Sequence, residues 1–271
     1  MVEKVDQFSN TYSKFSDETL AEVRRETFGT DIGQNSWTLR SEYLIFIESL
    51  GLSSGHQLLD VACGAGGPAV FCASKTGCSV VGVDHDPSGI RTAVQRAHDA
   101  GIADRARFQV VDARATLPFE DRTFDSIICI DAVIHFPDRL AVLRDWFRIL
   151  KPGGKVLYTD PVVITGLVTD EELALRSSIA NFTFAPPNED ERLLRAAGFR
   201  IRRVADLTSA MAQVAGAWHA ARARHQAKLL EVEGKERFDG SQRFFDCVHR
   251  LAAEHRLSRI MFLGERGETV T

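Results

Sequence analysis

The sequence predicts an α/β fold built on a mostly parallel sheet with helices on both faces. Two observations carry this prediction. Short apolar runs alternate with helical segments, and continuous apolar runs are typical of strands that a parallel sheet buries on both sides. A glycine cluster, Gly64 to Gly67, directly follows the first run, where a strand would turn into a helix. The strands predicted in this alternating part are residues 57–61, 79–83, 106–111, 126–130 and 155–159.

The first 55 residues have a helical pattern. Apolar residues from Tyr43 to Leu50 recur at helical spacing and stop at Gly51, and a polar turn from Gly33 to Trp37 precedes them. We expect residues 1–55 to form a helical lid.

Further helices separate the predicted strands. The clearest is 87–100, where Asp86 is a plausible N-cap, Pro87 takes the first helical position and Gly101 ends the helix. Another runs over 138–150 and is ended by Pro152 and the two glycines after it.

The order of elements changes after residue 160. The predicted elements there are helices 171–179 and 189–197, a strand at 200–204, helices 209–230 and 241–255, and a last strand at 258–263. The stretch 205–256 is too long for a hairpin loop, and insertions of this kind often cover an active site. We place no domain boundary, so residues 1–271 are expected to form a single domain.

Composition excludes several classes of protein. The formal net charge is −4, so no strongly basic field favours nucleic acid. Five cysteines without a Cys-x-x-Cys pair indicate neither a disulfide framework nor a metal site. No apolar run is long enough to span a bilayer, and Met1 to Asn10 does not read as a signal peptide. These features predict a cytoplasmic protein that binds neither nucleic acid nor membrane.

The glycine cluster has acidic partners at two later strand ends. Gly64 and Gly66 let the backbone pass close to a ligand, although this spacing alone also fits dinucleotide-binding proteins. Asp84 ends the second strand, at the spacing expected of a ribose-binding carboxylate, and His85 follows it. Asp112 ends the third strand, where a carboxylate could meet an adenine amino group. Each of these residues could instead cap a helix, but three successive strand ends are harder to explain in that way.

At this point the chain resembles the class I S-adenosylmethionine-dependent methyltransferases. The resemblance covers residues 55–163 and rests on segments in the family's order and spacing, which are Leu58–Gly67, Val81–Asp84, Val111–Ala113, Phe124–Ile130 and Leu150–Val156. It implies a Rossmann-like, seven-stranded sheet with an antiparallel last strand. It also implies S-adenosylmethionine as cofactor, S-adenosylhomocysteine as product, and residues 56–163 as the cofactor-binding core.

The resemblance also assigns expected contacts with the cofactor. Gly64 and Gly66 would approach its methionine part, Asp84 would hold the ribose, and His85 could line the same pocket. The remaining expected cofactor contacts are Asp112 and Ala113 at the adenine, Ile130 beside the sulfonium, and Gln34 and Trp37 folding over the methionine end, with Tyr12 as a further lid residue.

Within the class, Ile134 to Arg139 followed by Leu150 to Gly154 resembles the small-molecule branch. That branch includes sugar O-methyltransferases of natural-product pathways, quinone C-methyltransferases, and sarcosine and dimethylglycine N-methyltransferases. We therefore expect methyl transfer to N or O of a natural product or metabolite. Trp218, His219 and Arg222 in the insertion could line the pocket for this acceptor, although Trp218 is more easily read as core.

His135 and Asp160 are the expected catalytic residues. His135 follows the fourth strand, and its ordinary pKa of about 6.5 suits a proton acceptor. Asp160 ends the fifth strand, where it could orient His135, act as a base or hold a substrate amine. These roles match those in sugar O-methyltransferases that the chain resembles. His135 could equally order its loop, and Asp131 is a second-rank candidate.

Other functions stay open at this stage. The chain could be a C-methyltransferase of a small molecule, a nicotinamide-dependent reductase, a non-catalytic cofactor-binding protein or a nucleic-acid methyltransferase. The absence of a Tyr-x-x-x-Lys pair disfavours the reductase, and the acidic balance disfavours the nucleic-acid enzyme. Inserted helices often meet a second copy of the chain, so a homodimer is a possible partner arrangement.

Overall fold

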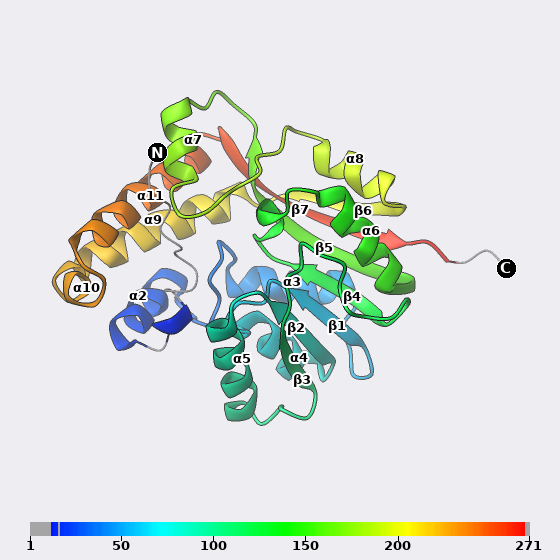
Figure 1. Cartoon of the computed structure of the whole chain (residues 1–271). Helices are drawn as coiled ribbons and strands as arrows, with labels where there is room; N and C mark the ends of the chain where they lie inside the picture. Colours follow the sequence, from blue (N-terminus) through cyan, green and yellow to red (C-terminus); the bar gives the residue numbers. More distant parts are fainter. Residues whose placement is uncertain (1–11, 16, 269–271) are drawn as a thin grey trace.

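A computed structural model describes residues 12–15 and 17–268 of the chain. Seven strands form one sheet in the order β3-β2-β1-β4-β5-β7-β6 (Figure 1). Their bounds are β1 Gln57–Val61, β2 Ser79–Asp84, β3 Ala106–Val110, β4 Phe124–Cys129, β5 Leu150–Ile164, β6 Phe199–Asp206 and β7 Leu257–Arg266. Strands β1 to β5 pair in parallel, and β7 lies antiparallel between β5 and β6. The predicted α/β class and the implied antiparallel last strand are both confirmed.

Helices cover both faces of the sheet because successive residues of each strand point to opposite sides. Leu58 faces the core formed with α3 (Arg40–Leu50), α4 (Gly67–Thr76) and α5 (Pro87–Asp99). Leu59 faces the core formed with α6 (Arg139–Ile149) and α8 (Glu189–Ala196). Both cores are apolar, and they fix the strand ends on which the site is built.

Aspartate side chains cap the start of two of these helices, and the sequence predicts the one at Asp86. The carboxylate of Asp86 accepts hydrogen bonds from the backbone N–H groups of Ser88 and Gly89 at the start of α5. Asp138 likewise accepts from the N–H of Ala141 at the start of α6. The segment after α6 differs from the prediction, because β5 begins at Leu150 and carries Pro152 and the two glycines within the strand.

Three helices form the insertion before β7, and two predicted boundaries there are wrong. The helix expected at 209–230 is divided at His225 into α9 (Thr208–Arg224) and α10 (Gln226–Glu233), and α11 (Lys235–Ala253) begins earlier than residue 241. No Gly or Pro marks the break at His225. Its ring Nε2 lies 2.6 Å from Oε1 of Glu26 in α2 (Glu18–Phe28), so this turn contacts a neighbouring helix.

The insertion packs against the N-terminal part of the chain rather than against the sheet alone. Val23 of α2 is buried together with Ala221, Leu229 and Phe238 of α9, α10 and α11. Figure 1 shows α2 beside α9 and α10, with the short α7 (Asp170–Arg176) near α11. Segments far apart in the sequence thereby meet above the carboxyl ends of the strands. Among the described residues, no helix is both long and apolar enough to cross a membrane.

Candidate active site

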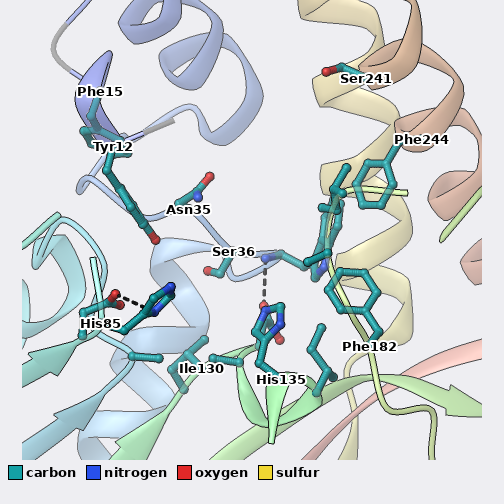
Figure 2. Close-up of a pocket in the computed structure, with 18 of the residues that line it drawn as sticks. Tyr12, Phe15, Asn35, Ser36, His85, Ile130, His135, Phe182, Ser241 and Phe244 are labelled. Carbon is teal, nitrogen blue, oxygen red and sulfur yellow. Dashed lines mark hydrogen bonds and ion pairs between the residues drawn. The ribbon is translucent and has the colours of Figure 1, made fainter. Parts of the chain in front are cut away.

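A cavity of about 590 Å³ lies between the carboxyl ends of the strands and the helices of the insertion. Figure 2 shows side chains from the N-terminal segment, the strand ends and α11 pointing into it. Of the residues expected at the cofactor, those that line the cavity are Tyr12, Trp37, Asp84, His85, Asp112, Ala113 and Ile130. Ala62, just before the glycine cluster, lines the cavity, whereas Gly64 and Gly66, expected at the methionine part of the cofactor, do not.

The glycine loop is held in a conformation that larger side chains would not tolerate. Gly66 has φ +71°, and a Cβ added to it would lie 2.5 Å from the Cβ of Ala93 in α5. Gly64 has φ +53°, and its added Cβ would lie 2.3 Å from the hydroxyl of Tyr12. The loop therefore packs closely against α5 on one side and is covered by Tyr12 on the other.

Asp84 connects this loop to the end of β2. Its Oδ2 accepts a hydrogen bond from the N–H of Gly64 at 2.9 Å, and its Oδ1 accepts from the N–H of Asp86 at 2.9 Å. His85 Nδ1 lies 3.4 Å from the same Oδ1, and this hydrogen bond raises the pKa of His85 (Figure 2). The structure thus brings together the loop and the carboxylate that the sequence predicts to share one ligand.

The carboxylate of Asp112 lies at the cavity and is half exposed. Arg114 binds it with two nitrogen atoms, Nε and Nη2, at 2.9 and 2.8 Å. These hydrogen bonds lower the pKa of Asp112 to about 2, so the group is ionised at neutral pH. Ala113, beside it, also lines the cavity.

His135 lies on a short 3-10 helix, Val133–His135, after β4. Its ring is 5.2 Å from the ring of Phe182, and its Nδ1 is 3.4 Å from the carbonyl oxygen of Asn181. Burial lowers the pKa of His135 to about 4, so the imidazole is neutral near pH 7. If Nδ1 donates to that carbonyl, the lone pair that can accept a proton lies on Nε2.

Asp160 does not lie beside His135, and that prediction is corrected. Its side chain is fully buried, Oδ2 accepts from Arg139 Nη1 at 2.6 Å, and Oδ1 accepts from the N–H of Val162 at 2.8 Å. Arg139 also binds Asp190 at 3.1 Å. Asp160 belongs to this buried ion cluster under α6 and α8 and does not line the cavity, because its oxygens point to the start of α6.

Gln34 is the second corrected residue. Its side chain is fully buried, and its Oε1 accepts from the N–H of Ile32 at 2.9 Å, which stabilises the turn itself. The residues after it, Asn35, Ser36 and Trp37, are the ones that line the cavity. Of the acceptor-site candidates in the insertion, Trp218 and Arg222 line the cavity and His219 does not.

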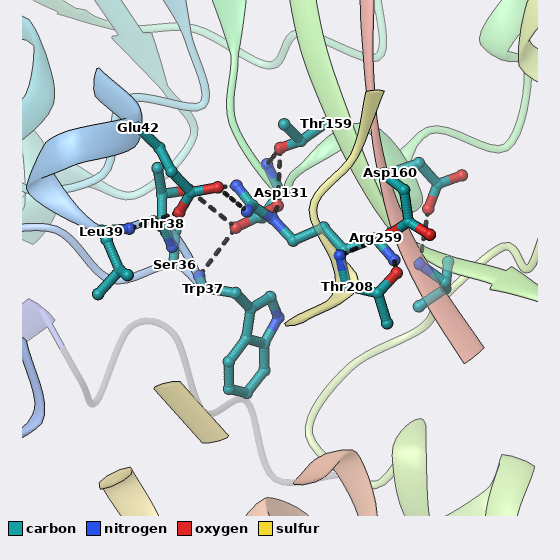
Figure 3. Close-up of polar contacts among 12 residues, drawn as sticks. Ser36, Trp37, Thr38, Leu39, Glu42, Asp131, Thr159, Asp160, Thr208 and Arg259 are labelled. Atoms are coloured by element: carbon teal, nitrogen blue, oxygen red, sulfur yellow. Dashed lines mark hydrogen bonds and ion pairs between the residues drawn. The ribbon is translucent and has the colours of Figure 1, made fainter. Parts of the chain in front are cut away.

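A buried charge network that the sequence does not reveal holds the segment around Trp37. Arg259 of β7 binds Asp131 through Nε at 2.7 Å and Glu42 through Nη1 at 2.8 Å (Figure 3). Asp131 also accepts from the N–H of Trp37 at 2.8 Å and from Thr159 Oγ1 at 2.7 Å. Asp131 lines the cavity, but its two oxygens serve this network, so it positions the loop.

Known proteins resemble this chain in sequence and in fold. Residues 58–154 match a family model described as a methyltransferase domain. A methyltransferase of Streptomyces halstedii (GfsG) is 40% identical over 47% of this chain and 45% of its own length. The 27-O-demethylrifamycin SV methyltransferase of Amycolatopsis mediterranei is 31% identical over 59% of each chain. The chain therefore matches about half the length of these curated relatives.

Solved structures show the same fold over nearly the whole chain. Phosphoethanolamine N-methyltransferase 2 of Haemonchus contortus, bound to phosphomonomethylethanolamine and S-adenosylhomocysteine, has a TM-score of 0.81. It is 23% identical and covers 96% of this chain and 59% of its own. The [4+2]-cyclase SpnF has a TM-score of 0.77 at 22% identity, over 99% of this chain and 97% of its own. At these identities the likeness concerns the fold.

Proposed function

We propose that this chain transfers a methyl group from S-adenosylmethionine to a small molecule. The premise is that residues 58–154, which match the family model, form a methyltransferase domain. The acceptor atom is nitrogen or oxygen, and the acceptor is a natural product or another metabolite. The observation that carries the proposal is the convergence of three strand ends, at Ala62, Asp84 and Asp112, on one cavity. All three residues lie within the stretch that matches the methyltransferase domain model.

The residues of the cavity fit this cofactor. Asp84 and Asp112 offer acceptors for ribose hydroxyls and for an adenine amino group, and Ala113 adds a small apolar surface. The close packing at Gly64 and Gly66 fixes the turn after β1, and the N–H of Gly64 holds Asp84 at the cavity. Bound S-adenosylmethionine supplies a methyl group activated by a sulfonium.

His135 is proposed as the group that accepts a proton from the acceptor. It is neutral at pH 7, because burial lowers its pKa to about 4, and it lies after β4 near Ile130 (Figure 2). A positioned base contributes about 10²–10⁴-fold when the nucleophile carries a proton that must leave. Asp160, which is buried away from the cavity, has no place in this step.

The aromatic side chains of the insertion and of the N-terminal segment would exclude water from the acceptor. Trp37 packs against Phe244 and Phe245 of α11, with ring centroids 6.1 Å apart in both pairs. Excluding water and holding the acceptor in line contribute about 7–11 kcal/mol to well-oriented reactions.

A homodimer stays a prediction, which analytical ultracentrifugation tests.

Labelled cofactor tests the proposal. The full chain is incubated with methyl-deuterated S-adenosylmethionine and a small-molecule extract of its host, and mass spectrometry follows the label. We expect a deuterated small molecule together with S-adenosylhomocysteine, both lost with heat-inactivated protein. A cofactor that binds but is never consumed would contradict methyl transfer and favour a non-catalytic cofactor-binding protein.

A further inference from the structure

The cavity contains an unusual cation, Arg176. Arg176, at the end of α7, lines the cavity, and its side chain is 1% exposed. Its Nε and Nη2 atoms are buried and have no hydrogen-bond partner among the described residues. Burial lowers the pKa of Arg176 to about 10, so the guanidinium is still charged at neutral pH.

Aromatic rings, rather than carboxylates, surround this charge. The Cζ of Arg176 lies 4.8 Å from the ring centroid of Phe182, 5.2 Å from that of Phe244 and 5.8 Å from that of Trp37. Such contacts attract a cation, but they supply no oxygen to accept its N–H groups. A buried guanidinium without an anionic partner is costly, and Arg176 has no such partner among the described residues.

The other charged residues of the cavity have partners in the described part of the chain. Arg24 binds Asp31, Arg114 binds Asp112, and Arg222 binds Glu233. Asp131 is bound by Arg259, and Lys14 donates to the carbonyl of Val232. Arg237 also pairs with Glu233, at 3.8 Å. Arg176 differs from these cavity cations, because the described residues supply it with no ion pair.

Arg176 and the proposed proton acceptor contact the same ring. Phe182 lies 5.2 Å from the ring of His135 and 4.8 Å from the Cζ of Arg176. One small molecule can thus reach both groups. The ring faces of Trp37 and Phe244 beside the guanidinium suit an acceptor that is flat or apolar next to its charge.

We propose that Arg176 binds an anionic group of the acceptor, a carboxylate or a phosphate monoester, and so selects anionic substrates. This proposal rests on the proposed function, because it assigns the acceptor end of the same cavity. The planar guanidinium suits both anions, since each offers two oxygens to its parallel N–H groups. The anion would sit against the ring cluster of Trp37, Phe182 and Phe244, with the atom to be methylated toward His135.

Matched aromatic probes test this assignment. The full chain is saturated with S-adenosylhomocysteine and titrated with benzoate, phenyl phosphate and benzamide, with binding followed by ligand-observed NMR. We expect at least one of the two anions to bind about tenfold or more tightly than benzamide. The anion would accept charge-assisted hydrogen bonds from Arg176, whereas the neutral amide of benzamide would accept weaker ones. Preference for benzoate indicates a carboxylate acceptor, and preference for phenyl phosphate indicates a phosphate acceptor.

Variants assign the preference to one side chain. Arg176→Met should abolish it while S-adenosylhomocysteine still binds, and Arg192→Met, at an exposed ion pair with Glu189, should leave it intact. Arg176→Lys, which keeps a charge but loses the planar fork, should retain a weaker preference, so the test does not depend on the stability of one variant.

Two results separate the failure of this proposal from that of the proposed function. Equal affinity for benzamide and both anions, or an anion preference that survives in Arg176→Met, would overturn the role of Arg176 even if the cofactor product binds. Failure of wild-type protein to bind S-adenosylhomocysteine would instead count against the methyltransferase function.

Discussion

Nε of Arg259 on the last strand donates to Oδ1 of Asp131 after β4 at 2.7 Å, and the side chains are 0% and 5% exposed. The same guanidinium binds Glu42 at the start of α3. This interaction joins the sheet to the N-terminal segment that carries Trp37 (Figure 3). The cofactor cavity therefore depends on a buried cation outside its own lining.

Removing this cation should destabilise the protein strongly. Arg259→Met leaves the carboxylates of Asp131 and Glu42 buried without their partner, and breaking a buried pair in this way costs about 3–5 kcal/mol. Urea unfolding measures the loss. Arg202→Met is the control, since its ion pair with Glu265 is about half exposed and should contribute less than about 1 kcal/mol. Similar losses in the two variants would contradict the role given to Arg259.

The glycine loop should tolerate no added methyl group at Gly66. In Gly66→Ala the new Cβ would lie 2.5 Å from that of Ala93, whereas at Gly101, with a similar φ of +67°, nothing lies within 4 Å. Both variants bear the cost of a left-handed backbone, but only Gly66→Ala adds overpacking, worth about 1–3 kcal/mol. We expect Gly66→Ala to lower the free energy of unfolding by that amount more than Gly101→Ala does. S-adenosylhomocysteine binding should be lost in Gly66→Ala alone. Equal effects of the two variants would show that the loop has room to move.

Stability should fall with rising pH because of Asp190. Burial, followed by repulsion from Asp160, raises the pKa of Asp190 from its ordinary 3.8 to about 7. The folded state therefore keeps a proton that the unfolded chain releases, so this contribution is fully present below about pH 4 and is lost as the pH rises to about 7. Relative to Asp190→Asn, the unfolding free energy of the wild type should decline across that window and level off above it. Urea unfolding of both proteins at several pH values measures this decline. Parallel plots of unfolding free energy against pH for the wild type and Asp190→Asn would contradict the role given to Asp190.

His135 should stay neutral well into the acid range. Because burial lowers its pKa to about 4, its ring resonances should not titrate between pH 8 and about 5. An NMR titration of the imidazole checks this, and a midpoint near 6.5 would show that the ring is exposed. The stability that the neutral ring contributes is present above about pH 6.5 and is lost as the pH falls through about 4.

Replacing His135 should affect turnover more than cofactor binding. If His135 accepts the proton, His135→Gln lowers the rate of methyl transfer by about 10²–10⁴-fold and leaves S-adenosylhomocysteine affinity unchanged. His98→Gln, at an exposed ring on α5, is the matched control and should be without effect. Full activity in His135→Gln would reduce this residue to a packing role against Phe182.

The sequence predicts those parts of the site that are local in the chain. Asp84 and Asp112 follow their strands directly, so the pattern of apolar runs is enough to place both at one edge of the sheet. The cap at Asp86 is local in the same sense, and the structure confirms it.

The parts that depend on long-range packing could not be predicted in this way. The sequence predicts that Asp160 ends its strand as Asp84 does, but β5 continues to Ile164. The carboxylate of Asp160 binds the buried Arg139 of α6 instead of facing the cavity. Arg259 reaches Asp131 only because β7 inserts between β5 and β6. Arg176 lies in a short, highly charged helix, and such a pattern predicts an exposed helix. The burial of the Arg176 side chain among aromatic rings is seen only in the folded structure.

Calorimetric titration with S-adenosylmethionine, S-adenosylhomocysteine and NADPH tests the central claim most directly. The two sulfur nucleotides should bind the wild-type protein, and Asp84→Ala should lose that binding, because Asp84 fixes Gly64 and faces the cavity. NADPH should not bind. Binding of NADPH without binding of S-adenosylhomocysteine would contradict the assignment of the cavity and the roles proposed for its residues.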